Sequence, residues 1–293
     1  MRIVFIGSVF FSEYMLKELI NVDAGIVGVV TKQASKFNSD FCDLSSLCAK
    51  KDIPCTYTTD VNSAKTIEWI KALNPDVVFC FGWSNLIKKE LLYLAPLGVV
   101  GFHPAALPAN RGRHPLIWAL ALGLKETAST FFFMKEGADD GDILSQEKIV
   151  IDDDDDAAAL YQKVIKTAKK QVRTFSKSLA DGTFQRIKQD DSKANNWRKR
   201  GLADGVIRFS MNARTIYNLT RALAKPYIGA SYFWGDEEIK VWKTRPVENH
   251  DDNLEYGKVL KVENGVITVK TPDGAIELIE HEFNPLPAKG DYL

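Results

Sequence analysis

The chain has 293 residues, 45% of them hydrophobic, with 38 basic and 38 acidic side chains. This composition is enough for one large or two modest globular domains, and the balanced charge excludes a protein that binds nucleic acid or a membrane surface through a strong overall field. No stretch approaches the ~18 uninterrupted apolar residues of a membrane span, and the first residues lack a secretory-signal pattern. We therefore expect a cytoplasmic protein without a membrane or nucleic-acid partner.

The N-terminal part alternates between strand-like and helical patterns. Apolar strand-like runs lie at 2–7, 24–32, 76–82 and 98–103, and helical patterns lie at 12–20, 63–74 and 88–94. Alternation of this kind predicts an α/β fold with a Rossmann-like, doubly wound, mostly parallel sheet. Ligands of such sheets bind beyond the carboxyl ends of the strands, so the segment after 98–103 is expected at the ligand-binding edge.

A helix starting at Pro115, strands at 128–134 and 142–151 and a long helix ending near Ala180 follow in the chain. Five aspartates, 152–156, precede the long helix. Carboxylates at the positive end of a helix dipole cap it and offset the dipole, so we expect capping there rather than a cation site. The four cysteines form no C-x-x-C pair and have no histidine nearby, which also argues against a bound metal.

The composition turns polar after residue 184. We predict a catalytic domain at 1–184, a linker at 185–205 and a C-terminal domain at 206–293. Hairpin signals at Asn264-Gly265 and Asp273-Gly274 indicate a small OB-like β-barrel in the last of these. Its exposed strands are compatible with a homodimer.

The candidate chemistry lies in two loops. His103 ends a predicted strand, and the acidic loop 137–143 follows another, so both are expected at the same edge of the sheet. A histidine titrates near neutral pH, and a nearby aspartate orients the imidazole and stabilises its charged form, which suits proton transfer at a carbonyl under attack. A purely structural histidine at a strand end is the alternative. The chain lacks G-x-S-x-G, Walker A and G-x-G-x-x-G motifs, which argues against serine hydrolases, P-loop NTPases and dinucleotide dehydrogenases.

Residues 101–144, GFHPAALPANRGRHPLIWALALGLKETASTFFFMKEGADDGDIL, resemble the signature of the folate-dependent formyltransferases. That family has an Asn-x-His-Pro-x-x-Leu-Pro-x-x-Arg-Gly stretch, a Thr-rich strand and an Asp-x-Gly loop. Residues 221–245 are similar to the opening of the second domain of methionyl-tRNA and nucleotide-sugar formyltransferases. The resemblance covers essentially the whole chain.

The resemblance implies that N10-formyltetrahydrofolate is the cofactor and that its formyl group moves to a primary amine. His103 is then implied to relay a proton and stabilise the oxyanion, and Asp139 is implied to hold His103 and carry the proton. The residues implied to hold the cofactor are Phe81, Gly82, Trp83, Leu86, Ile87, Gly137, Asp140 and Asp142.

One position departs from the family pattern. Gly101 stands where the family has the asparagine whose amide assists oxyanion binding. Either water, a backbone N–H or a displaced side chain takes its place, with Asn110 the nearest candidate, or the protein is slow or inactive. Loss of one such donor typically costs about 10²–10³ in rate.

Three features favour a sugar substrate over initiator tRNA. Segment 31–41 lacks the basic insertion of the tRNA enzymes, and residues 246–293 contain four lysines, no arginine and ten acids, a net charge of −6 that repels a phosphate backbone. Residues 110–123 also resemble the sugar-modifying branch. The implied substrate contacts are Arg113, for a diphosphate or carboxylate, together with Arg200, Ser8 and Phe11. Arg111 could equally brace its loop.

We therefore expect a sugar N-formyltransferase that acts on a nucleotide-linked amino-deoxysugar in polysaccharide biosynthesis. The alternatives are a methionyl-tRNA formyltransferase and a non-catalytic protein that binds folate or a nucleotide sugar.

Overall fold

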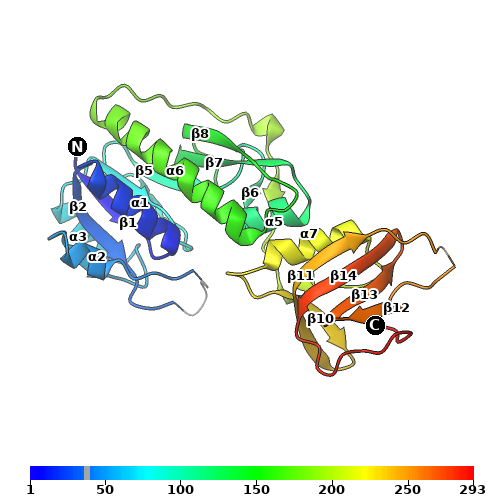
Figure 1. Ribbon diagram of the computed structural model, residues 1–293. Coiled ribbons are helices and arrows are strands. Elements are labelled where there is room, and N and C mark those ends of the chain that lie inside the picture. Colours follow the sequence, from blue (N-terminus) through cyan, green and yellow to red (C-terminus); the bar gives the residue numbers. More distant parts are fainter. Residues whose placement is uncertain (36–39, 252) are drawn as a thin grey trace. The chain divides into compact units, whose positions relative to one another are not determined.

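The computed structural model describes residues 1–35, 40–251 and 253–293 (Figure 1). These residues form two compact units. The first unit comprises 1–112, 127–149 and 162–197, and the second comprises 113–126, 150–161 and 198–293. The division at residues 184 and 206 stays a prediction. The expectation for segment 31–41 falls partly on residues 36–39, which lie outside the described residues, as does Asp252.

A seven-stranded sheet in the order β3-β2-β1-β4-β5-β7-β8 forms the centre of the first unit. Neighbours from β3 to β5 pair in parallel, and β7 pairs antiparallel to β5. The strands are β1 (Ile3–Ile6), β2 (Ile26–Thr31), β3 (Cys55–Tyr57), β4 (Val77–Cys80), β5 (Val99–His103), β7 (Glu126–Phe133) and β8 (Ile143–Val150). The predicted mostly parallel sheet is confirmed.

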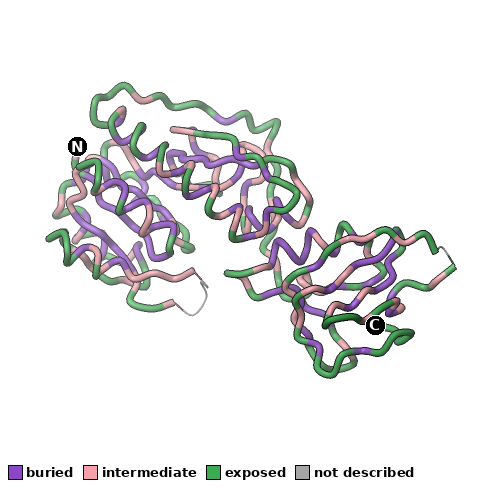
Figure 2. Tube along the Cα trace, viewed as in Figure 1, coloured by how far each residue is buried: buried purple, intermediate pink, exposed green. Residues whose placement is uncertain are grey.

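Helices on both faces of this sheet explain why its strands are continuous apolar runs (Figure 2). On one face, Val4 and Val78 pack in a cluster with Ile70 and Leu91. On the other face, the Phe79 ring meets the Phe175 ring at 5.8 Å between centroids. The helices are α1 (Phe10–Asn21), α2 (Ser45–Ala49), α3 (Ala64–Ala72), α4 (Lys89–Leu92) and α6 (Ala157–Ala180). The predicted end of the long helix at Ala180 is confirmed.

The second unit contains a five-stranded antiparallel sheet in the order β10-β11-β14-β13-β12. Asn264 and Gly265 connect β12 to β13 and both have positive φ, as a two-residue type I′ hairpin requires. The OB-like description of this unit stays a prediction. Its elements are α5 (Pro115–Ala121), α7 (Ala213–Leu223), β10 (Ala230–Trp234), β11 (Glu237–Val247), β12 (Val259–Glu263), β13 (Val266–Thr271) and β14 (Gly274–His281).

One of the five aspartates before α6, Asp156, caps the helix, as predicted. Asp156 Oδ1 accepts the backbone N–H of Ala159 at 2.8 Å, and Asp155 Oδ2 accepts that of Asp152 at 2.7 Å. The buried Arg221 guanidinium donates to the carbonyls of Asp152 and Asp155 at 3.1 Å each. Carboxylate and carbonyl oxygens of this turn are thus used in holding the helix end.

Among the described residues, no helix is long and apolar enough to cross a bilayer.

Candidate active site

His103 is the last residue of β5 and is only 5% exposed. Its side chain lies on the same face of the strand as Gly101, because alternate residues of a strand share a face. Three side chains of β7 and β8 hold the loop that follows. They are Thr127, which donates to the Pro104 carbonyl at 3.2 Å, Thr130, which donates to the Ala105 carbonyl at 2.6 Å, and Gln146, which donates to the Leu107 carbonyl at 2.9 Å. The Thr-containing strand therefore fixes the path of the histidine loop.

The imidazole of His103 lies between two loops. Its Nε2 is 2.7 Å from the carbonyl oxygen of Asn110, and its Nδ1 is 3.6 Å from Oδ2 of Asp139. The same Asp139 oxygen accepts the backbone N–H of Gly112 at 2.9 Å. The structure thus brings the two predicted catalytic side chains together at the carboxyl end of β5.

This geometry determines where the histidine carries its proton. A carbonyl oxygen only accepts hydrogen bonds, so Nε2 of His103 must donate to Asn110. In the neutral imidazole the lone pair is then on Nδ1, the nitrogen that faces the Asp139 carboxylate.

Gln189 joins the two loops. Its amide nitrogen donates to the carbonyls of Asp139 and Gly141 at 2.8 and 2.6 Å, and its amide oxygen accepts from Arg111 Nη2 at 2.7 Å. Arg111 also pairs with Asp191 at 2.8 Å. Arg111 therefore braces its loop.

Asn195 adds a second brace, because its Oδ1 accepts the backbone N–H of Asn110 at 2.7 Å. Residues Asn196–Trp197 (β9) then pair with Arg111–Gly112 (β6). Gln189 and Asn195 were missed by sequence reasoning because they lie in the polar segment interpreted as a linker. Gln189 is only 5% exposed, but the polar composition of its segment gives no indication that this glutamine is buried.

The space beside Gly101 is filled by a thioether. A Cβ on Gly101 would meet Met134 Cγ at 2.8 Å and Met134 Sδ at 3.0 Å. A thioether sulfur donates no hydrogen bond, so Met134 does not replace the amide of the family asparagine. The backbone carbonyl of Asn110 binds His103, and a role for the Asn110 side chain in oxyanion binding stays a prediction.

The segment 81–87 offers a mixture of buried and exposed groups. Phe81 is fully buried and stacks on Phe79 at 5.2 Å, and Ile87 belongs to the core, whereas Leu86 is exposed. Gly82 has φ 74°, and a Cβ there would lie 2.3 Å from a methyl group of Val9. Within this segment, the side chains of Phe81 and Ile87 are part of the hydrophobic core.

Trp83 is the most informative residue of that segment. Its indole nitrogen is buried and has no hydrogen-bond partner among the described residues. The Lys32 ammonium lies 4.4 Å from the centroid of the indole ring, and burial lowers the pKa of Lys32. Trp83 thus leaves one donor unused beneath the surface.

The acidic loop contains a matching acceptor. Asp140 Oδ1 is buried and lacks a partner within the part of the chain that the structure describes. Asp142 instead pairs with Lys135 at 2.8 Å, and a Cβ on Gly137 would clash with the Asp140 carboxylate. Gly141 must be glycine, because a Cβ would lie 1.6 Å from the carbonyl oxygen of Phe133.

The predicted substrate contacts fall in different places. Ser8 and Phe11 are buried, and the Phe11 ring stacks on Phe102 at 4.1 Å between centroids, so it is part of the core rather than an accessible surface.

The two predicted substrate-binding arginines, Arg113 and Arg200, belong to the second unit. Arg113 is exposed, and Arg200 donates to the Asp204 carbonyl at 2.5 Å. Burial lowers the pKa of Arg200, whose guanidinium lies 4.5 Å from the Trp118 ring.

Comparison with solved structures shows a shared fold at low identity. The HypX protein from Aquifex aeolicus, solved with tetrahydrofolic acid, is 18% identical with a TM-score of 0.68; the match covers 95% of this chain but only 43% of HypX. An N-formyltransferase from Helicobacter canadensis, solved with folinic acid and dTDP-3-aminofucose, is 16% identical with a TM-score of 0.71 over 95% of this chain and 98% of that one. A sugar N-formyltransferase from a Shewanella species is 20% identical with a TM-score of 0.67 over 82% and 96%.

Family models match most of the sequence. The model "Formyl transferase" matches residues 1–174 and "Formyl transferase, C-terminal domain" matches residues 201–289. The first match contains both His103 and Asp139, and the two matches together span both the parallel sheet and the antiparallel sheet. The chain belongs to the formyl transferase family.

Proposed function

We propose that this protein is a sugar N-formyltransferase that uses N10-formyltetrahydrofolate to formylate the primary amine of a nucleotide-linked amino-deoxysugar. The observation that carries the proposal is the 3.6 Å contact between His103 and Asp139, made at the ligand-binding edge of a formyl transferase domain. The sugar substrate is supported by the fold shared with the Helicobacter enzyme over nearly the full length of both chains. The acidic C-terminal segment, which disfavours tRNA, supports it as well.

The residues present fit a folate. A pterin ring carries both hydrogen-bond donors and acceptors, and the two segments proposed to hold it contain one unused group of each kind. Trp83 Nε1 is the donor and Asp140 Oδ1 is the acceptor, both buried and without a partner among the residues described. Buried polar groups are nearly always paired in a functional state, so these two atoms are candidates for cofactor contacts.

When bound, the cofactor supplies an activated formyl group for transfer to an amine. The protein would then take up the proton that the amine loses and return it to the tetrahydrofolate nitrogen that releases the formyl group. Because Nε2 of His103 is tied to the Asn110 carbonyl, Nδ1 is the atom that accepts this proton, and the Asp139 carboxylate stabilises the resulting imidazolium. The loop bonds from Thr127, Thr130 and Gln146 hold this arrangement before substrate arrives.

A non-catalytic binder of folate or nucleotide sugar is the second candidate, and the Gly101–Met134 contact favours it. Where the family has an amide, this chain has a methionine side chain that cannot donate to an oxyanion. Such a protein would keep the cofactor contacts and lose the transfer reaction.

One experiment distinguishes these candidates. The protein is incubated with N10-formyltetrahydrofolate and a panel of nucleotide-linked aminosugars, with methionyl initiator tRNA as a parallel substrate, and products are analysed by mass spectrometry. Addition of one formyl group to a sugar by the native protein, but not by His103→Ala, is expected. Formylation of the tRNA alone would contradict the sugar proposal, and folate binding without any transfer would favour the binder.

A further inference from the structure

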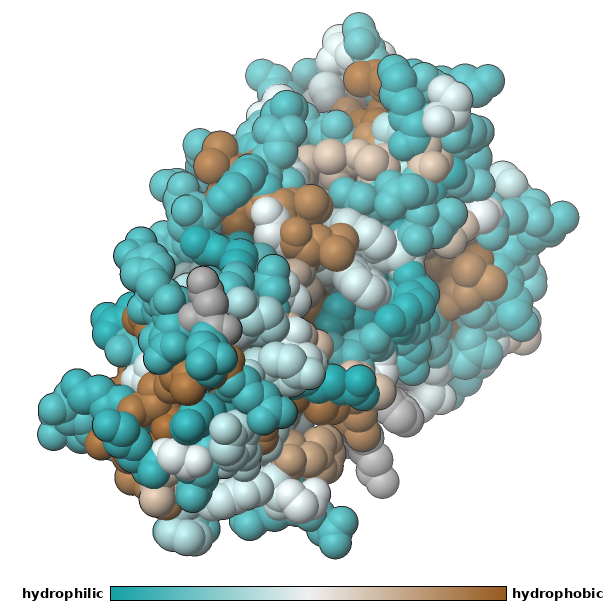
Figure 3. All heavy atoms as spheres, turned by 90° about the vertical axis from the view of Figure 1, so that its right-hand side faces the viewer, coloured by the Kyte–Doolittle hydropathy of each residue, from teal (hydrophilic) through white to brown (hydrophobic). Residues whose placement is uncertain are grey.

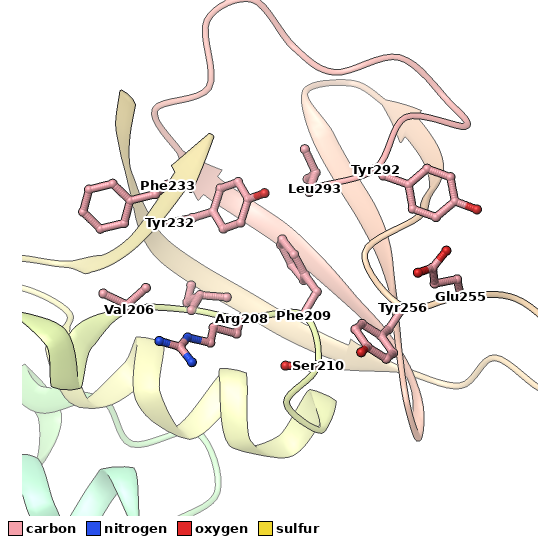
Figure 4. Close-up of a pocket in the computed structure, with 11 residues that line it drawn as sticks. Val206, Arg208, Phe209, Ser210, Tyr232, Phe233, Glu255, Tyr256, Tyr292 and Leu293 are labelled. Atoms are coloured by element: carbon pink, nitrogen blue, oxygen red, sulfur yellow. The ribbon is translucent and has the colours of Figure 1, made fainter. Parts of the chain in front are cut away.

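A cleft in the second unit lies apart in sequence from the residues of the His103 site (Figure 4). Its volume is about 470 Å³, within the ~300–1,000 Å³ of small-molecule sites. Its lining includes two charged and four aromatic residues: Arg208, Glu255, Phe209, Tyr232, Tyr256 and Tyr292. None of them takes part in the chemistry proposed above.

The cleft lies between the two edges of the antiparallel sheet. On one side, residues 206–210 run beside the edge strand β10, with the Ile207 N–H donating to the Ser231 carbonyl at 2.7 Å. On the other side, residues 255 and 256 precede the opposite edge strand β12, where the Leu293 N–H donates to the Gly257 carbonyl at 2.9 Å. Main-chain hydrogen bonds thus hold both walls in place.

Aromatic side chains line this space from both walls. Phe209 and Tyr232 are buried, with ring centroids 5.2 Å apart, whereas Tyr256 and Tyr292 are 50% and 53% exposed. In Figure 4 the rings of Phe209 and Tyr232 point into the cleft, and Tyr256 and Tyr292 flank Glu255 on the opposite side. On the molecular face drawn in Figure 3, apolar side chains likewise form patches within a mostly hydrophilic surface. Exposed aromatic rings gathered around a hollow are typical of a binding site.

The charges of the cleft do not favour a phosphate-bearing ligand. Arg208 and Glu255 lie at opposite ends in Figure 4, so the walls do not form a cationic cradle. The lining holds one basic side chain, Arg208, and one acidic side chain, Glu255, so its charged side chains balance. A ligand suited to this cleft is uncharged, has an apolar face for a tyrosine ring and has hydroxyl groups that donate to a carboxylate.

We propose that this cleft binds a neutral sugar ring of a saccharide. The C–H face of the sugar stacks on Tyr256 or Tyr292, and its hydroxyl groups donate to the Glu255 carboxylate. The proposal does not depend on the identity of the formyl acceptor, because it rests on residues of the second unit alone. A sugar bound here would be a ligand additional to any substrate of the His103 site.

The test uses the full chain and ligand-observed saturation-transfer NMR with maltotriose, chitotriose and methyl β-glucopyranoside at millimolar concentrations. At least one of these saccharides is expected to bind. Substitution of the tyrosine on which the sugar stacks, Tyr256→Ala or Tyr292→Ala, should weaken binding by roughly tenfold, and the corresponding phenylalanine variant should retain most of it because the ring remains. The matched control is Tyr93→Ala, which removes an exposed tyrosine of the first unit and should change nothing.

Circular dichroism and formyl transfer by the same variants show whether the fold and the His103 site are intact. Absence of binding by all three saccharides, or binding that Tyr256→Ala and Tyr292→Ala leave unchanged, would overturn the proposal. Binding of uridine monophosphate in place of the saccharides, with the same sensitivity to Tyr256→Ala, would assign the cleft to nucleotides instead. A homodimer that Tyr256→Ala dissociates, without saccharide binding, would assign it to subunit contact.

Discussion

The side chain of Met134 occupies the space that a side chain on Gly101 would need, with Met134 Cγ 2.8 Å from the position of the missing Cβ. Gly101 is the middle residue of β5, on the face that carries His103, and Met134 follows β7, with its backbone N–H donating to the Val99 carbonyl at 2.7 Å. In the proposed mechanism, an amide that binds the oxyanion from position 101 would therefore also require a change at position 134. An asparagine at position 101 can enter only if the Met134 side chain shifts or is replaced by a smaller one.

We predict that Gly101→Asn alone gives no gain in formyl transfer and lowers the free energy of unfolding by about 1–3 kcal/mol, because the core is overpacked. Gly101→Asn combined with Met134→Ala should raise kcat by about 10²-fold, the contribution of one oxyanion donor. Steady-state kinetics and thermal unfolding measure both effects. Met134→Ala alone is the control, and a double variant no faster than this control would show that the amide has no role here.

We expect substitution of Asp139 to lower the rate of formyl transfer far more than it lowers the stability of the fold. Asp139→Asn keeps an oxygen that can accept the Gly112 N–H but removes the charge beside His103 Nδ1. We expect kcat to fall by about 10²–10⁴, the usual contribution of general acid–base catalysis, with little change in Tm. Asp181→Asn, the same change at an exposed position after α6, is the control. A decrease in kcat of less than tenfold would contradict a role for Asp139 in the proton transfer.

Gln189 should be needed to hold the two site loops together. Gln189→Ala leaves two backbone carbonyls and Nε of Arg111 without their partner, which should cost about 1–3 kcal/mol in the free energy of unfolding. The rate should fall as well, because Asp139 loses its support. Chemical denaturation and kinetics are compared with Gln185→Ala, an exposed glutamine of the same segment. Equal effects of the two substitutions would contradict the bracing role.

The cysteines should differ in reactivity. A hydrogen bond from the Cys48 thiol lowers the pKa of Cys55, whereas burial raises the pKa of Cys42 and raises that of Cys80 to about 12. A lower pKa gives more thiolate at a given pH, so iodoacetamide at mildly alkaline pH should label Cys55 first, and labelling of Cys42 should require higher pH. Peptide mass spectrometry measures the order. Cys48→Ala should slow labelling of Cys55. Labelling of Cys42 before Cys55 in the native protein would contradict the predicted order of reactivity.

The parallel sheet could be predicted because its strands are covered on both faces and appear as apolar runs separated by helical patterns. The same logic placed His103 and the acidic loop at one edge, where the structure brings Asp139 to 3.6 Å from the imidazole. The end of α6 was predictable from its Asp-Gly stop, because the signal is local.

Other features depend on packing that a single sequence does not encode locally. Ser8 and Phe11 were expected to face ligand, yet the turn after β1 lies so close to β4 that a Cβ on Gly7 would be 2.5 Å from the Phe81 carbonyl oxygen. Both side chains are buried, and the Phe11 ring stacks on Phe102. Met134 was not recognised because its neighbour Gly101 is distant in sequence, and Gln189 was not recognised because its polar surroundings resemble a linker.

The bracing by Gln189 and Asn195 has a practical consequence for dividing the protein. A shortened chain that stops at residue 184, after the last helix of the first unit, would retain the complete seven-stranded sheet and both proposed catalytic side chains. It would nevertheless lack the amides that position the Asn110 and Asp139 loops. Such a fragment would be a poor guide to the native activity, and a cut intended to keep these two amides belongs after Trp197.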